Sequence, residues 1–406
     1  MSRRFVLRGV SGTFPLTAVP AGIELAGHPD SVLQLCKPDR RVIVAEGAPV
    51  TAGTPLCSDA RLGEFASVSG IVRRVFPWEG GERGKFTAVH IEREHSDAIT
   101  QLVDPIADPT KSDVATVKNS LEVTGNDLPP TGASLLITLL DEDVGRVVNR
   151  WYLEKDFRVV RAGLQIIRHL YGTGAVQIAV PVTLSADRCG ELVAFGRVIP
   201  VAPTYPQVLS ELILRSLAGM TGGGRTRVLT AWHLAAMAEA LTSGRAATTM
   251  PVAVRVGRAG QTRLLRVPIG MQVGALCAAC GITVEAGMLV VMGGEMRGVA
   301  VDTLDQPLFP GYDAVLVVPA GEVEAPESTP CINCGRCYRK CPVRLRVDLL
   351  GRCVEFTKDE ELLRLGIGQC IDCGVCASVC MVRRPLAHLM AYGKQRAARF
   401  KKEAVA

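Results

Sequence analysis

Short apolar runs broken by glycine- and proline-rich turns dominate the first hundred residues of the chain. Residues 41–56 alternate apolar and turn residues, and residues 66–75 continue the pattern. Alternation over such short distances predicts β-strands joined by tight turns. We therefore expect residues 1–103 to form a hairpin-rich β-barrel module.

The pattern changes after a polar, proline-containing stretch at 104–132, which we interpret as a linker. Continuous apolar runs at 133–140 and 174–182 fit buried parallel strands, and a helical periodicity separates them at 144–170. The strand–helix–strand order predicts a parallel α/β domain at 133–250.

The remainder of the chain divides into two further segments. Two short strands followed by a strand–turn–helix pattern predict a small β-grasp domain at 251–318. Linker composition returns at 319–330, and a cysteine-rich module occupies 331–406. The pattern as a whole predicts a multidomain protein of mixed α/β and α+β class.

The cysteine-rich module repeats one spacing, C-x-x-C-x-x-C-x-x-x-C. The first run comprises Cys331, Cys334, Cys337 and Cys341, and the second comprises Cys370, Cys373, Cys376 and Cys380. This is the bacterial ferredoxin arrangement for [4Fe–4S] clusters, in which the fourth cysteine of each run ligates the other cluster. We expect one cluster on Cys331, Cys334, Cys337 and Cys380, and a second on Cys370, Cys373, Cys376 and Cys341. Zinc is disfavoured because its sites need only four thiolates and usually lack the third C-x-x step.

The two runs differ in their surroundings. Pro342 follows Cys341, whereas Met381 follows Cys380. Because proline ends the ligand turn and helps to exclude water, we expect the first cluster to be somewhat more exposed. Apolar neighbours should still give both clusters a dry shell, namely Ile332, Ile371, Val375 and Val379. Basic residues around the module should attract acidic carriers, namely Arg336, Arg339, Lys340, Arg344 and Arg346.

A separate pair, Cys277 and Cys280, forms a C-x-x-C motif on a segment expected to be helical. Such a pair can hold a thiolate of lowered pKa and cycle between dithiol and disulfide. Apolar residues flank the pair, so the two cysteines also fit the role of small core residues on an apolar helix face. A redox dithiol and a structural pair therefore both remain open.

Composition and charge limit the class of protein. The chain has 406 residues, 48% hydrophobic and 21% charged, which is ordinary for globular proteins. No apolar run reaches the ~18 residues that span a bilayer, so we expect a cytoplasmic protein, with attachment at the inner face of the membrane as an alternative. The net charge of +6 comes without aromatic-interleaved basic motifs, so no nucleic-acid partner is expected. The basic tail could dock an acidic carrier or a membrane, or simply be solvated; it contains Lys394, Arg396, Arg399, Lys401 and Lys402.

Several local motifs together resemble the C subunit of Rnf-type electron-transport complexes and the related cobalamin-reductase family of the propanediol-utilisation type. They are Ala66-Ser-Val-Ser-Gly70, Tyr205-Pro206, Pro268-Ile-Gly270, Val291-Met-Gly-Gly-Glu-Met-Arg-Gly298 and the two cysteine runs. The resemblance implies a barrel-sandwich hybrid, an α/β domain, an SLBB-type (soluble-ligand-binding) β-grasp domain and a paired [4Fe–4S] module, in that order. Barrel-sandwich carrier domains present a lysine at the hairpin tip, but residues 58–64 contain none, so the module is expected to dock or pack.

One departure from that family bears on cofactors. The family opens its α/β domain with a glycine-rich loop, taken to hold flavin and NADH phosphates. The corresponding residues 128–134 keep only Gly132, and the acidic segment after the next strand is altered to Asp141-Glu142-Asp143. The glycine run 222–224 follows an expected helix and is interpreted as a plain loop. We therefore expect a degenerate α/β scaffold that binds neither FMN nor NADH.

The resemblance thus narrows to RnfC-like proteins without the nucleotide loop, such as those associated with proline reductase. It implies an electron-transfer subunit that relays single electrons through two [4Fe–4S] clusters. The donor would be a flavoprotein or ferredoxin, and the acceptor a partner reductase. Two alternatives remain: a flavin-dependent NADH:acceptor oxidoreductase subunit of an Rnf-type complex, and a non-catalytic scaffold of a redox complex. Whether the chain is itself an enzyme is left open.

Overall fold

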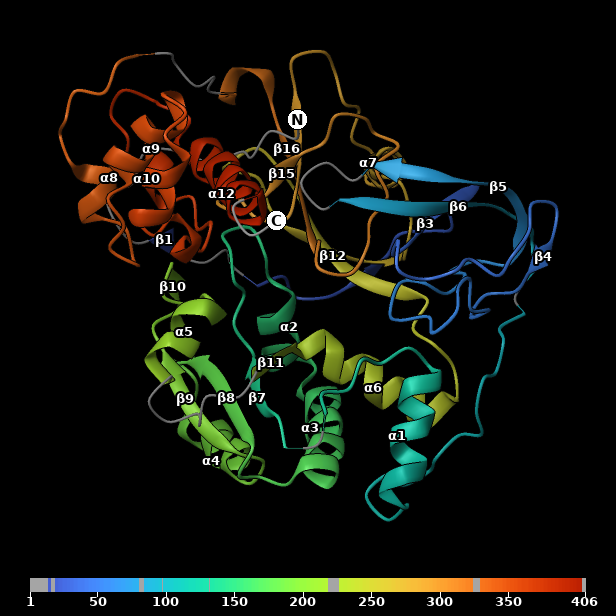
Figure 1. Ribbon diagram of the computed structural model, residues 1–406. Coiled ribbons are helices and arrows are strands. Elements are labelled where there is room, and N and C mark those ends of the chain that lie inside the picture. The colour runs from blue at the N-terminus through green and yellow to red at the C-terminus, as the bar shows by residue number, and fades with distance from the viewer. Residues whose placement is uncertain are drawn as a thin grey trace.

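The computed structural model describes residues 14–15, 19–79, 84–96, 98–130, 132–217, 226–323 and 329–403. Figure 1 shows a β-rich part built from the blue N-terminal segment, a green α/β layer, and a sheet of yellow and orange strands between them. The red C-terminal helices form a separate lobe beside that sheet. The structure is therefore a mixed α/β protein with several sheets, as the sequence predicts. The glycine run 222–224 lies outside the described residues.

The N-terminal sheet is antiparallel, with strand order β3-β6-β5-β4. Its strands are β3 (Ser31–Cys36), β4 (Pro49–Val50), β5 (Gly70–Glu79) and β6 (Lys85–Arg93). The strand-and-turn character predicted for this region is confirmed. Two short N-terminal strands join other sheets: β1 (Phe14–Pro15) pairs with β10 (Thr204–Tyr205), and β2 (Glu24–Leu25) pairs with β13 (Arg263–Pro268).

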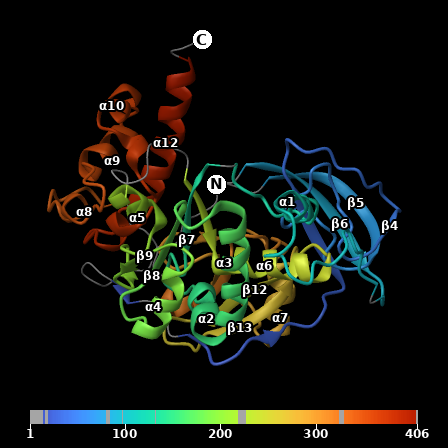
Figure 2. The same cartoon turned by 90° about the horizontal axis from the view of Figure 1, so that it is seen from below.

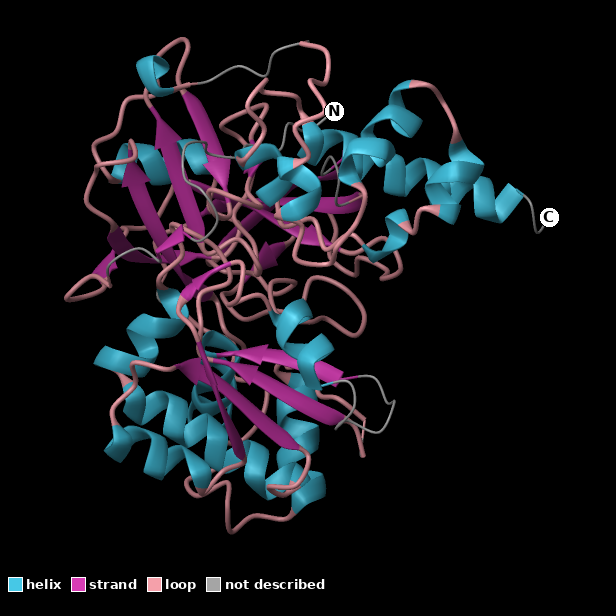
Figure 3. Ribbon diagram, turned by 90° about the vertical axis from the view of Figure 1, so that its left-hand side faces the viewer, coloured by secondary structure: helices cyan, strands magenta, loops and turns pink. Residues whose placement is uncertain are grey.

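The α/β layer contains a parallel four-stranded sheet of order β11-β7-β8-β9, which confirms the predicted parallel arrangement. Its strands are β7 (Ser134–Thr138), β8 (Val176–Pro181), β9 (Arg197–Val201) and β11 (Thr226–Thr230). The helices of this region are α1 (Val114–Val123), α2 (Val148–Lys155), α3 (Phe157–Tyr171), α4 (Ala186–Val193), α5 (Ser210–Leu217) and α6 (Ala231–Ser243). Figure 3 shows this sheet with helices packed against it.

Both faces of β7 are buried, which explains its unbroken apolar sequence. Leu135 and Ile137 belong to the same apolar core as α3 and α6. Leu136 belongs to a second core, together with α5, Tyr205 and Ile371 of the second cysteine run. Alternation along a strand sends neighbouring side chains to opposite faces. One face of the sheet therefore packs against α3 and α6. The other face packs against α5 and also against the C-terminal lobe.

A six-stranded mixed sheet of order β15-β14-β16-β12-β13-β2 lies between these parts. Its remaining elements are β12 (Thr249–Val256), β14 (Leu289–Met292), β15 (Val299–Ala300), β16 (Ala314–Val318) and the helix α7 (Val273–Ala279). The two strands predicted at the start of this segment are confirmed. They form the antiparallel pair β12–β13.

The C-terminal lobe is helical in its regular elements. It contains α8 (Arg336–Arg339), α9 (Val347–Glu355), α10 (Asp359–Arg364), α11 (Val375–Ser378) and α12 (Leu386–Glu403). Seen from below in Figure 2, α12 runs beside α9 and α10 and extends away from the rest of the lobe. None of the helices in the described residues is long and apolar enough to cross a membrane.

Candidate metal centre

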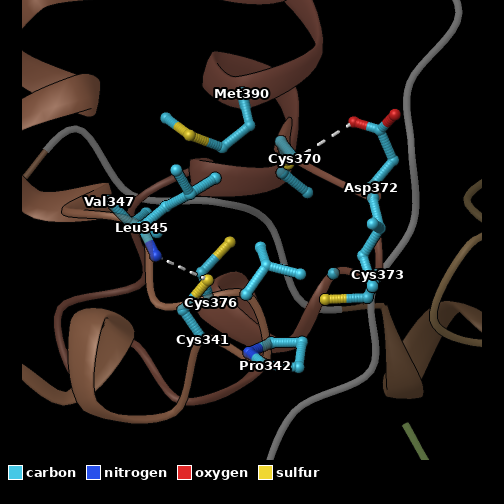
Figure 4. Close-up of a pocket in the computed structure, with 13 residues that line it drawn as sticks. Cys341, Pro342, Leu345, Val347, Cys370, Asp372, Cys373, Cys376 and Met390 are labelled. Atoms are coloured by element: carbon cyan, nitrogen blue, oxygen red, sulfur yellow. Dashed lines mark hydrogen bonds between the residues drawn. The ribbon is translucent and has the colours of Figure 1, made fainter. Parts of the chain in front are cut away.

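Four cysteines from the two runs line one pocket in the C-terminal lobe. Cys370, Cys373 and Cys376 come from the second run and Cys341 comes from the first. The rest of the wall is mostly apolar, including Val347 and Met390 (Figure 4). The structure thus brings together the four residues predicted to hold the second cluster.

The pKa of the Cys376 thiol is affected by the other three cysteines of this set. Burial, followed by the neighbouring thiols of Cys373, Cys370 and Cys341, raises the pKa of Cys376 well above its ordinary value. Burial likewise raises the pKa of the Cys373 thiol to about 12. Metals are ligated by thiolates, so a bound cation would be needed to keep these buried sulfurs ionised.

The ligand loops have the same backbone conformation in both runs. Asn333 and Asp372 occupy the same position in the two loops, with φ of 56° and 52°. Gly335 and Gly374 follow with φ of 68° and 72°, and each precedes a short helix. Asparagine, aspartate and glycine are the residues that tolerate this left-handed region. Local sequence therefore turns both loops in the same way.

The cysteines of the first predicted ligand set are less buried than those of the second. Burial raises the pKa of Cys337 to about 11, with smaller contributions from Asp348 and then from the thiols of Cys380 and Cys331. All members of this set, including Cys334, are half-buried. Cys380 belongs to the second run, so this group too joins residues of both runs.

The donor chemistry and the pocket fit an iron–sulfur group. Among residues in the described ranges, no three His, Cys, Asp or Glu side chains are arranged to hold a single metal ion. A cubane does not require such convergence, because its four thiolates bind four different iron atoms. A pocket with four thiols and an apolar wall suits that larger group.

Two polar contacts fix the second loop. The Tyr205 hydroxyl donates to the Cys373 carbonyl at 2.5 Å. Lys394 Nζ donates to the Cys370 carbonyl at 2.9 Å and lies 2.5 Å from Asp372 Oδ2. Neither role was foreseen, because the sequence showed Lys394 only as part of a basic tail. The Tyr205-Pro206 motif was the one available signal for the tyrosine.

The apolar shell expected from the sequence is present on one side only. Ile371 and Val375 are buried, and Val379 is half-buried. Ile332, by contrast, is 56% exposed. The expectation of a dry shell at Ile332 is wrong, because no described segment covers the first loop as the α/β layer covers the second.

The altered acidic segment lies beside the second loop. Asp141 is paired with Arg150 at 2.8 Å, and Asp143 accepts backbone N–H groups of Met296 and Arg297 at 2.9 Å and 2.7 Å. A polar cavity of about 290 Å³ separates this segment from Asp372. These carboxylates therefore hold neighbouring backbone in place, next to the loop that carries the second ligand set.

The predicted dithiol lies elsewhere. Cys277 is buried on α7 and Cys280 is the half-buried residue that ends this helix. Burial raises the pKa of Cys277 to about 11 and also raises the pKa of Cys280. In Figures 1 and 2, α7 lies well apart from α8–α10. Raised pKa values do not provide the reactive thiolate of a redox pair, and the redox role stays a prediction.

Comparison with known proteins bears on the module and on the family. Residues 326–381, which contain both cysteine runs, match the family model of the 4Fe-4S dicluster domain. This match supports iron–sulfur clusters as cofactors. The chain is 37% identical over 81 residues to the C subunit of the ion-translocating oxidoreductase complex of Rhodobacter capsulatus, covering 20% of this chain and 16% of that protein.

A longer match extends beyond the cysteine module. The chain is 24% identical over 212 residues to the C subunit of the proton-translocating ferredoxin:NAD(+) oxidoreductase complex of Clostridium ljungdahlii, covering 50% of this chain and 46% of that protein. The chain is RnfC-like. The matched part spans less than half of the length of either RnfC relative. An NAD+-reducing [NiFe]-hydrogenase in the air-oxidized state aligns with a TM-score of 0.42 and 17% identity over 65% of this chain and 56% of its own.

Proposed function

We propose that this RnfC-like chain is an electron-transfer subunit of an oxidoreductase complex, passing single electrons through two [4Fe–4S] clusters to a partner reductase. One observation carries the proposal: thiols from both cysteine runs line a single pocket whose other residues are mostly apolar. Supporting it, the Cys337 thiol has Cys380 and Cys331 among its electrostatic neighbours. Two such groups, linked through the same short helical turns, suit transfer between two centres held close together.

In this proposal, Cys331, Cys334, Cys337 and Cys380 hold one cluster, and Cys370, Cys373, Cys376 and Cys341 hold the other. The clusters would supply one-electron carriers, and the chain's own residues would fix their environment. The N–H of Leu345 donates to Cys341 Sγ at 3.3 Å, which stabilises negative charge on that sulfur. Val347 and Met390 line the same pocket and exclude water from it.

The source of electrons is proposed to be another protein, a flavoprotein or ferredoxin. The support is the region 128–134, which keeps only Gly132 of the nucleotide loop. The finer architecture is likewise proposed: a barrel-sandwich hybrid at 1–103 and an SLBB-type β-grasp domain at 251–318, with the degenerate α/β domain between them. Such modules would attach the electron-handling lobe to its complex, in the cytoplasm or at the inner face of the membrane.

Anaerobic reconstitution followed by spectroscopy tests the proposal. We expect about eight iron atoms per chain, electron paramagnetic resonance signals from two reduced clusters with dithionite, and no reduction by NADH. Cys353→Ser, which changes a half-buried cysteine outside both ligand sets, serves as the control. If NADH reduces the clusters and the protein shows flavin absorbance, the proposal is wrong and the chain is an NADH oxidoreductase subunit. If the partner complex turns over normally with the Cys334→Ser variant, the relay is not needed and the chain acts as a scaffold.

A further inference from the structure

The two ligand loops share one backbone conformation but differ sharply in exposure. Ile332 of the first loop is 56% exposed, whereas Ile371 at the same position of the second is 8% exposed. Tyr338 is 43% exposed, and its counterpart Ala377 is 7% exposed. The second loop packs against the core that contains Leu136 and Tyr205. The repeat thus provides an internal comparison in which only the first loop keeps large apolar side chains in solvent.

The apolar exposure continues on the ligand turn that comes from the other run. Met381, which follows Cys380, is 57% exposed. Ile332, Tyr338 and Met381 are therefore sequence neighbours of three ligands of the first set. Exposed large apolar side chains beside several members of one ligand set are the kind of feature that marks an interaction site.

The same surface is basic. Between Cys331 and Arg346 the sequence contains no acidic residue. Its cations are all exposed: Arg336, Arg339, Lys340, Arg344 and Arg346. Of these, Arg346 is paired with Asp348, and Arg339 donates to the Cys334 carbonyl. In the second run, the counterparts of Arg336, Arg339 and Lys340 are the uncharged Val375, Ser378 and Val379, whereas Arg344 corresponds to Arg383. Positive charge is therefore concentrated on the exposed loop.

The position of this loop leaves it open to a partner. In Figures 1 and 2, α8, which carries Arg336 and Tyr338, lies at the outer edge of the molecule. The loop of the second set lies instead against the α/β layer, where Tyr205 binds it. One ligand set faces outward and the other faces the rest of the protein.

We propose that a surface made of exposed residues is the docking site of an acidic, single-electron carrier protein. Its residues are Ile332, Arg336, Tyr338, Arg339, Lys340, Arg344, Arg346 and Met381. The inference rests on the proposed function. In the step it serves, one electron leaves the reduced carrier and enters the first cluster, without forming or breaking a bond. A basic rim steers an acidic partner to the site and speeds encounter. The exposed apolar side chains of Ile332, Tyr338 and Met381 then exclude water at the contact between the two redox centres.

The test compares two triple variants of the reconstituted full-length protein that remove equal charge. The docking variant carries Arg336→Ser, Lys340→Ser and Arg344→Ser. The control variant carries Arg399→Ser, Lys401→Ser and Lys402→Ser at the exposed end of α12. The probe is an acidic bacterial ferredoxin, with its affinity measured by calorimetry and its electron transfer measured by stopped flow, at low and at moderate salt.

We expect the docking variant to bind the ferredoxin about tenfold more weakly at low salt, and with a flatter salt dependence. The control variant should stay within about twofold of the unmodified protein. Equal losses in both variants, or none in either, would overturn the proposal. So would a docking variant that loses binding to phosphatidylglycerol vesicles but keeps its ferredoxin affinity, because the surface would then be a membrane contact.

Dithionite separates failure of this inference from failure of the proposed function. It needs no docking surface, so it should reduce both clusters of either variant. If dithionite reduces two clusters while ferredoxin affinity is unchanged by the substitutions, the docking surface is wrong and the electron-transfer function stands. Iron content equal to that of the unmodified protein confirms that the exposed substitutions preserve the module.

Discussion

The hydroxyl of Tyr205 donates to the backbone carbonyl of Cys373 at 2.5 Å, and both residues are buried. Tyr205 lies on β10 at the edge of the α/β layer, and Cys373 lies in the loop of the second ligand set. The two residues share an apolar core with Leu136 and Val375. This contact joins the cysteine module to the α/β layer and explains why that layer covers one ligand loop and not the other.

Removing this hydroxyl should loosen the second loop. Tyr205→Phe keeps the ring but leaves the buried Cys373 carbonyl without this donor, so we expect a loss of about 1–3 kcal/mol in the free energy of unfolding. Urea unfolding of the reconstituted protein measures it. Tyr392→Phe, at an exposed position of α12, is the matched control. Equal stability of both variants would show that the contact contributes nothing.

Cross-ligation between the runs predicts a specific pattern of iron loss. Cys341→Ala combined with Cys376→Ala removes two ligands of one proposed cluster, so about four of about eight iron atoms should remain. Cys341→Ala combined with Cys331→Ala should remove both clusters. Ligation within each run would reverse the two results. Iron and sulfide analysis decides between them, with Cys353→Ala expected to retain the full content.

The charge of Lys394 should raise the reduction potential of the second cluster. Its Nζ lies 2.5 Å from Asp372 Oδ2, beside the Cys370 carbonyl. Lys394→Met removes a cation that is paired with Asp372, and the loss of this positive charge disfavours adding an electron to the nearby cluster. We expect the potential to fall by roughly 40 mV, the equivalent of about 1 kcal/mol for one electron. A redox titration followed by electron paramagnetic resonance measures the shift, and Lys401→Met should leave the potential unchanged.

Stability should decrease in acid because of His233. Burial, and after it Arg227, lowers the pKa of His233 to about 4. Its Nδ1 accepts the Thr230 backbone N–H at 3.2 Å, so this nitrogen must be unprotonated to cap α6. The unfolded chain binds a proton near pH 6.5, so the unfolded state gains protons first as the pH falls. Stability is therefore lost below about pH 6.5, by about 2 kcal/mol between pH 7 and pH 5.

His233→Gln tests this assignment. Glutamine suits this position of a capping box and does not titrate, so the variant should fold and lose less stability between pH 7 and pH 5 than the unmodified protein. Urea unfolding at the two pH values measures the difference. An unchanged pH dependence in the variant would assign the acid sensitivity to other groups.

A strand could be predicted where its apolar sequence matches the burial that the folded protein gives it. The run 133–140 predicts a buried strand, and β7 is buried on both faces. The pairing of β2 with β13 could not be foreseen, because a two-residue strand has no periodicity and its partner lies far along the chain. Tyr205 and Lys394 were missed for the same reason: each acts on a loop that is distant in sequence.

The chemistry and the local shape of the ligand loops follow from the amino-acid sequence alone. The spacing of eight cysteines specifies thiol groups for iron–sulfur clusters, and asparagine, aspartate and glycine allow the left-handed turns at Asn333 and Asp372, Gly335 and Gly374. Which loop is covered depends instead on the three-dimensional packing. Ile332 and Ile371 have nearly identical neighbours in sequence, yet one is exposed and the other buried. Burial depends on what packs against a residue from elsewhere in the chain. Here the α/β layer packs against Ile371 through the core that contains Tyr205 and Leu136, and Ile332 is not part of that core.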